Sequence, residues 1–171
     1  MAKYRRRRYR KRRAIWSSNM QRLNIGPDGV DSNSPFYNSI TISQNPPLDL
    51  TKVSTKYTVK NIEIAAQLET SGTGDGVENI EYYIIYVPEG YVIDGDLPFK
   101  HPEWIMAYKF IGSALGPNAI TSNSQVPRIK SRLARKLNTG DSIIFMYMGY
   151  NKEGSTNVKL NGLLRWWTKS N

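Results

Sequence analysis

The densest cluster of chemically active side chains is a basic arm at the start of the chain. The first thirteen residues hold nine cations and no acidic residue. The cations are Lys3, Arg5, Arg6, Arg7, Arg8, Arg10, Lys11, Arg12 and Arg13. Guanidinium and ammonium groups neutralise phosphates and release counterions, which gives sequence-independent affinity for nucleic acid. Tyr4, Tyr9 and Trp16 are interleaved with the charge and can stack on unpaired bases. The pattern predicts an arm that binds nucleic acid.

The arm is also consistent with a solvated tail, a nuclear localisation signal or a membrane-surface patch. Arginine-rich composition with aromatic residues favours nucleic acid, and one arm can serve both genome binding and nuclear import. If all nine cations engage a single strand, the salt slope of binding is roughly −6. A block of like charges repels itself and cannot bury apolar surface, so the arm is predicted to be disordered until it meets an anion.

A second basic group lies in the segment 126–137. It contains Arg128, Lys130, Arg132, Arg135 and Lys136. As a strand, the segment would place Arg128, Lys130 and Arg132 on one face, where they could extend the arm's phosphate surface. As a helix, it would align Ile129 and Leu133 on an apolar stripe. The residues alone leave both readings open, together with the possibility of an ordinary solvated face.

Candidate catalytic and metal-binding residues are few. His101 is the only histidine and is followed by Pro102, a context in which a lone histidine is usually structural. The chain has no cysteine, and no nucleophile triad, zinc motif or phosphate-binding loop can be assembled. Asp94 and Asp96 could offer carboxylates to a cation, but no further ligand spacing accompanies them. The sequence therefore predicts no enzyme activity, no metal and no cofactor.

The charge divides the chain into parts. The net charge is +10, yet outside the arm the chain is close to neutral. Residues 1–15 form the predicted arm, residues 16–35 a polar linker rich in Ser, Asn, Gly and Asp, and residues 36–171 the folded body. No run of about 18 apolar residues is present, so membrane insertion is not expected.

The body has the pattern of an all-β antiparallel sandwich. Short runs of β-branched and aromatic residues alternate with turn residues. Together with 126–137, the predicted strands are 36–43, 61–69, 80–87, 104–111, 142–150 and 157–168. In the strand 61–69, the apolar residues occupy even-numbered positions, whereas Tyr57 and Val59 just before it occupy odd-numbered ones. This change of phase predicts a β-bulge near Asn61. The spacing fits a sandwich of seven or eight strands.

Several strands are apolar on both faces, although an antiparallel sandwich normally keeps one face polar. The runs 82–87 and 143–148 are apolar at every position. In the last strand, Leu163 and Trp167 point away from the face that carries Val158 and Leu160. Either a loop of the same chain or a neighbouring subunit must cover these surfaces. We expect a homo-oligomer, with Leu163 and Trp167 as candidate subunit contacts.

Three stretches give the sequence a family resemblance. They are IEYYIIYVPEGY (80–91), HPEWIMAYKFIGS (101–113) and RIKSRLARKLNTGDSIIFMYMGY (128–150). With the arginine-rich arm, they resemble the capsid proteins of circular, Rep-encoding single-stranded DNA viruses, the circovirus and nanovirus group. The chain departs from circovirus capsids in being shorter and in having a compact arm.

The resemblance implies an eight-stranded jelly roll that assembles into a small icosahedral shell, with the arms inside against circular single-stranded DNA. It implies location in the virion and in the host nucleus, with host import receptors as partners. The arm's nine cations would bind the genome and direct import. Arg128, Lys130 and Arg132 match a basic strand of the related sequences, which favours the strand reading of 126–137.

Two other function classes remain. The coat protein of a small RNA virus or satellite would use the same physics on RNA. A monomeric cellular nucleic-acid-binding protein of ribosomal type would show no large assembly and would carry a basic face across its body. The nearly neutral body argues against the latter.

Overall fold

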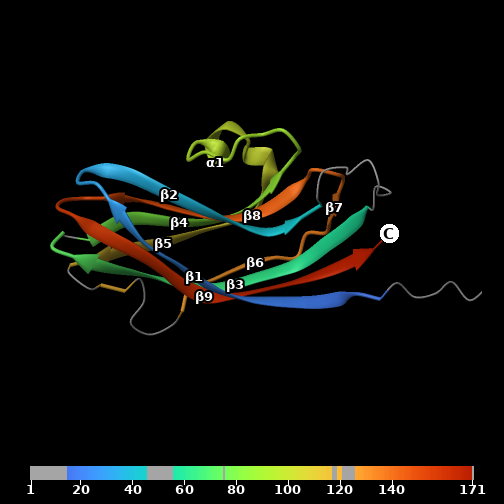
Figure 1. Ribbon diagram of the computed structural model, residues 1–171, viewed down its shortest axis with the longest axis horizontal. Coiled ribbons are helices and arrows are strands. Elements are labelled where there is room, and N and C mark those ends of the chain that lie inside the picture. Colours follow the sequence, from blue (N-terminus) through green and yellow to red (C-terminus); the bar gives the residue numbers. More distant parts are fainter. Residues whose placement is uncertain (1–14, 46–55, 75, 117–118, 121–125, 171) are drawn as a thin grey trace, which may run out of the picture.

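The computed structural model describes residues 15–45, 56–74, 76–116, 119–120 and 126–170, and it shows two antiparallel sheets packed face to face (Figure 1). The first sheet contains β1 (Ser17–Val30), β9 (Thr156–Ser170), β3 (Tyr57–Gly72), β6 (Arg128–Ser131) and β7 (Arg135–Leu137). The second contains β2 (Ser34–Gln44), β8 (Ser142–Asn151), β4 (Gly76–Val87) and β5 (Ile105–Leu115). The predicted arm residues at 1–13 lie outside the described residues.

The topology is that of a jelly roll. The short strands β6 and β7 both pair with β3, so they act as one interrupted strand and bring the total to eight. The strand orders are then β1-β9-β3-β6/β7 in one sheet and β2-β8-β4-β5 in the other. Two interlocked Greek keys produce this arrangement. The predicted all-β jelly roll is confirmed, and the segment 126–137 is strand rather than helix.

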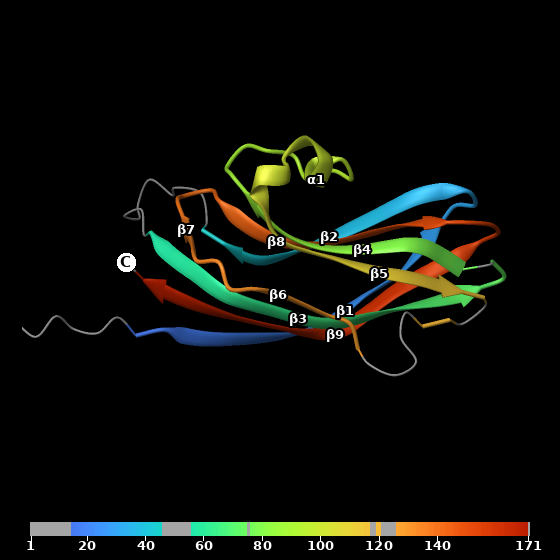
Figure 2. The ribbon, with the colours of Figure 1, turned by 180° about the vertical axis from the view of Figure 1, so that it is seen from behind.

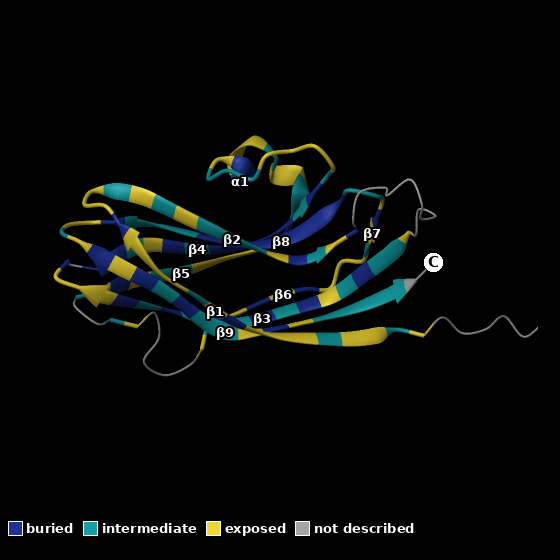
Figure 3. Ribbon diagram, in the orientation of Figure 1, coloured by how far each residue is buried: buried dark blue, intermediate teal, exposed yellow. Residues whose placement is uncertain are grey.

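The predicted linker at 16–35 is wrong, because this segment carries β1. The strand has fourteen residues, and twelve of them pair with β9 along an outer edge of the sheet. Only Leu23 and Val30 of β1 are buried (Figure 3). Its apolar residues are therefore too few to predict a strand from their alternation. The folded body therefore begins near Ser17, and β1 is the eighth strand of the sandwich.

The predicted bulge at Asn61 is present in β3. Asn61 has a φ of 50°, and the register of β3 against β9 shifts between Lys60 and Glu63. Val59 and Ile62 are both buried although they are three residues apart, so the bulge restores the inward phase of the strand. It also lies between the stretches of β3 that pair with β7 and with β6.

The core fills the space between the sheets. Leu160 and Leu164 of β9 are fully buried, as are Tyr82 of β4 and Phe145 of β8. The rings of Tyr82 and Phe145 meet edge to face at 5.3 Å. Figure 3 shows the resulting bands of buried and exposed residues along the strands.

The outer face of the second sheet carries a separate apolar cluster. It consists of Tyr83, Ile85, Val87, Ile144 and Met146 with Leu97 of the short helix α1 (Leu97–Lys100). Figure 2 shows α1, with the short 3-10 turn Pro102–Trp104, over this sheet. Of the two alternatives left open by the sequence, a loop of the same chain covers this apolar cluster. Among the described residues no helix is both long and apolar enough to cross a membrane.

One buried amide ties the two sheets together at an end of the sandwich. Asn151 closes β8, and its side-chain nitrogen lies 2.8 Å from the carbonyl of Asp31 and 2.9 Å from that of Gly154. Its oxygen accepts a hydrogen bond from the Thr156 hydroxyl at 3.1 Å. A fully buried amide needs such partners. The connections β1–β2 and β8–β9 are thus held by the same side chain.

Replacement of Leu97 tests the cover supplied by α1. Leu97 is 2% exposed, so Leu97→Ala should lower the free energy of unfolding by about 2–5 kcal/mol, measured by urea denaturation. Phe99, two residues along the same helix, is 68% exposed, and Phe99→Ala should change stability by less than about 0.5 kcal/mol. Equal losses from the two variants would contradict the assignment of the cover to α1.

Candidate nucleic-acid interface

The outer face of the first sheet gathers cations from every strand. Apolar residues of β9 and β3 point into the core, so their alternate neighbours point outward. Seven cations occupy outward positions in the rows between Lys169 and Asn161 of β9, and we call this surface the basic face. Its cations are Arg22, Lys60, Arg128, Lys130, Lys136, Arg165 and Lys169.

The rows of the basic face follow the strand register. One row joins Met20, Arg165, Glu63 and Lys130 across four strands. Glu63 is the carboxylate in these rows, and the Lys130 Nζ lies 3.0 Å from its Oε1. This pair offsets one of the seven cations, so the surface as a whole stays strongly positive. A positive surface of this size attracts polyanions.

Leu163 and Trp167 lie on the same surface. Trp167 is opposite Ser18 on one side and Lys60 on the other, and Leu163 is opposite Arg22 and Ala65. Leu163 is 42% exposed and Trp167 is half-buried. The structure therefore places both predicted subunit contacts among cations rather than on an apolar patch.

Of the three cations predicted to share one face of the strand at 126–137, the structure brings two together. Arg128 and Lys130 lie on the basic face, because Ile129 and Ser131 between them are buried. Arg132 is exposed but follows the end of β6, so it does not continue the row. Arg135 does not join them either, since its guanidinium lies 4.9 Å from the ring centroid of Tyr86.

Four cations of the face were not predicted from the sequence: Arg22, Lys60, Arg165 and Lys169. Arg22 fell in the supposed linker. The others alternate with core residues of β3 and β9, so the signal was present in each strand. The cations form one continuous surface only because strand pairing brings these outward positions side by side.

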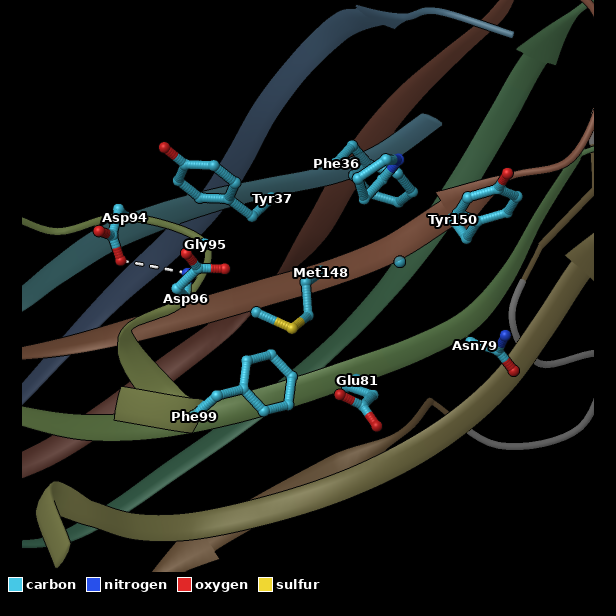
Figure 4. Close-up of a pocket in the computed structure, with 12 residues that line it drawn as sticks. Phe36, Tyr37, Asn79, Glu81, Asp94, Gly95, Asp96, Phe99, Met148 and Tyr150 are labelled. Atoms are coloured by element: carbon cyan, nitrogen blue, oxygen red, sulfur yellow. Dashed lines mark hydrogen bonds between the residues drawn. The ribbon is translucent and has the colours of Figure 1, made fainter. Parts of the chain in front are cut away.

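The second sheet carries the opposite charge on its outer side. A groove of about 530 Å³ opens between β2, β8, β4 and the loop before α1 (Figure 4). Aromatic rings and carboxylates line it, among them Tyr37, Glu81, Asp94, Asp96 and Phe99. The nearly neutral body is therefore polarised, with cations over one sheet and carboxylates over the other. The groove is a poor site for a phosphate backbone.

The carboxylates of the groove already have partners within the chain. The Lys100 ammonium lies 3.0 Å from Asp94 and 3.3 Å from Asp96. Its hydrogen bond lowers the pKa of Asp94, and the same bond raises the pKa of Lys100. Glu81 accepts hydrogen bonds from the hydroxyls of Tyr83 (2.6 Å) and Tyr108 (3.0 Å). Asp94 and Asp96 are thus paired with the last residue of α1.

His101 is part of the packing around α1. Its ring stacks on Trp104 at 3.8 Å with planes 7° apart, and its Nδ1 lies 3.2 Å from Glu103 Oε1. In the described part of the chain, no three His, Cys, Asp or Glu residues gather as metal ligands. The surroundings of His101 support the structural interpretation of this residue.

Comparison with known proteins gives matches among solved structures only. No protein family matches the chain, and no curated protein does. A chain of maize chlorotic mottle virus is 8% identical, over 91% of this chain and 93% of that one, with a TM-score of 0.48. A chain of infectious bursal disease virus strain Gt is 12% identical, over 91% of this chain and 33% of that one, with a TM-score of 0.36.

The infectious bursal disease virus VP2 subviral particle gives 9% identity, over 91% of this chain and 37% of that one, with a TM-score of 0.29. The present chain thus spans about a third of the length of either infectious bursal disease virus chain. At such identities these are similarities of chain path alone.

The salt dependence of binding tests the basic face. Each engaged phosphate of a single strand contributes about 0.7 to the salt slope. Arg22→Ser combined with Arg128→Ser should therefore lower the magnitude of the slope by about 1.4, measured by titration of an oligonucleotide at several salt concentrations. Lys100→Ser combined with Lys152→Ser is the control, since Lys100 lies beside Asp94 and Lys152 beside Glu78, both away from the face. This pair removes the same charge and should leave the slope unchanged. A comparable change in the control pair would contradict a localised interface.

Proposed function

We propose that the protein is a viral capsid protein that assembles with copies of itself into a small icosahedral shell around nucleic acid. The observation that carries the proposal is a jelly roll with cations gathered on one sheet, entered directly from an arginine-rich arm. Jelly rolls of this topology are common in viral capsids. The arm supplies positive charge, and the sandwich supplies a folded unit for contacts between copies.

The position of β1 supports joint action of arm and basic face. Residues 15 and 16 lead into β1, at the end of the sheet where β9 finishes (Figure 1). Trp16, three residues after the last cation of the arm, therefore lies beside Lys169 and Lys60 of the face. A polyanion held by the arm would also meet the face, so the two form one extended binding surface for a genome.

Exposed apolar side chains support contacts between copies. Tyr37, Phe99, Tyr108 and Phe110 are each about half exposed or more on the side of the second sheet. Apolar patches rimmed by polar residues are typical of protein interfaces. Leu163 remains a proposed subunit contact at the first sheet.

The finer parts of the proposal come from the family resemblance. The packaged molecule would be circular single-stranded DNA, and the arm would bind host import receptors. The protein would then be found in the virion and in the host nucleus. The arm and the basic face recognise phosphates, which RNA shares, so the coat protein of a small RNA virus is the second candidate. Sensitivity of the packaged nucleic acid to DNase rather than RNase is the expected result.

A monomeric cellular binding protein would also have a basic face. A nearly neutral body does not exclude that class, because the cations of the body gather over one sheet. Assembly is the property that separates the two classes, because a monomeric binding protein has no need of contacts between copies.

Deletion of residues 2–13 tests the role of the arm. The truncated chain keeps every described strand, so it should retain its circular dichroism spectrum and thermal transition. It loses all nine cations of the arm, and packaged nucleic acid should fall to near background, measured by the absorbance ratio at 260 and 280 nm after purification. A truncated protein that purifies with nucleic acid at the loading of the full chain would contradict the proposal.

A further inference from the structure

We infer that Trp16 and Trp167 form a stacking platform for unpaired bases, which makes the basic face selective for single-stranded nucleic acid. The inference rests on the proposed binding of nucleic acid by this face, and it adds the class of strand that the face recognises. It also gives Trp167 a role different from the subunit contact expected from the sequence.

The register places the two indoles on one face of the sheet, in neighbouring rows. Ser17 pairs with Thr168 and Ser18 with Trp167, so Trp16 enters the sheet beside Lys169, diagonal to Trp167. Side chains two residues apart on a strand share a face, which puts Trp16 on the side of Ser18. Diagonal neighbours on one sheet face are within reach of large aromatic side chains. Both indoles are half-buried, which leaves part of each ring open to solvent.

Cations already occupy the ring faces. The Lys60 Nζ lies 3.8 Å from the ring centroid of Trp16, and the Lys169 Nζ lies 6.0 Å from it. The Arg165 guanidinium lies 5.6 Å from the ring centroid of Trp167. These cations are on flexible stems, so a base that stacks on the indole can displace them onto the phosphates of the same strand. One surface then supplies both ring and charge, as single-strand sites require.

The other two tryptophans have packing roles instead. Trp104 stacks on His101 beside α1, and Trp166 packs against the core between the sheets. Trp16 and Trp167 share the outer face with seven cations. The centres of protein interfaces are depleted of charged residues, so the surroundings of the two indoles fit a polyanion better than a second protein.

The platform predicts that the face prefers single strands to a duplex. Bases in a duplex are already paired and stacked, so their faces are closed to an indole, whereas each unpaired base exposes a face. DNA and RNA share this chemistry. A duplex can therefore bind through its phosphates but cannot stack its bases on the indoles.

The test uses the full-length protein with three probes: oligothymidine, oligouridine and a DNA duplex of equal charge. Tryptophan fluorescence should be quenched by both single strands and much less by the duplex. Trp167→Leu should weaken binding of the single strands about tenfold, and Trp16→Leu similarly, with duplex affinity unchanged. Trp104→Phe is the matched control and should leave all three affinities unchanged. Circular dichroism of each variant establishes that it is folded.

Unchanged single-strand affinity in folded Trp167→Leu and Trp16→Leu would overturn the platform. If the Arg22→Ser and Arg128→Ser pair still reduced the salt slope, the proposed nucleic-acid binding by the face would stand without the platform. A folded Trp167→Leu that binds the probes normally but no longer associates with copies of itself would also overturn it, since Trp167 would then be a subunit contact.

Discussion

The alternation of side chains along β3 and β9 is the constraint on which the rest of the structure depends. These strands lie side by side in the first sheet, and every inward position must fill the core between the sheets. Leu160, Leu164, Ile64 and Leu68 meet that demand and are fully buried. The outward positions do not have to fill the core, and several of them carry cations. A body with almost no net charge thereby acquires one strongly basic surface.

The bulge at Asn61 keeps this separation intact along the whole of β3. Without the extra residue, strict alternation from Val59 would turn Ile62 outward and Glu63 inward. The bulge allows Val59 and Ile62 both to face the core while Lys60 and Glu63 face outward. It divides the partner strand into β6 and β7 at the same place. The local irregularity thus preserves both the core and the basic face.

Features carried by a single strand could be predicted from the sequence. The arm, most of the strands and the phase change at Asn61 are periodic or compositional signals. Other features depend on pairing or on tertiary contacts. The polar edge strand β1 lacks the apolar alternation of a buried strand. The cover of the outer sheet by Leu97 requires a loop to fold back, and the basic face requires a register that no single strand contains. The role of the arm in binding remains a prediction, because its residues lie outside the described part of the chain.

The mass of the purified full-length protein in solution, measured by light scattering together with its absorbance ratio at 260 and 280 nm, tests the central claim most directly. The account predicts a uniform particle many times the 19.5 kDa of one chain, rich in nucleic acid. A monomer that stays small after nucleic acid is added would contradict the shell and would favour a cellular nucleic-acid-binding protein.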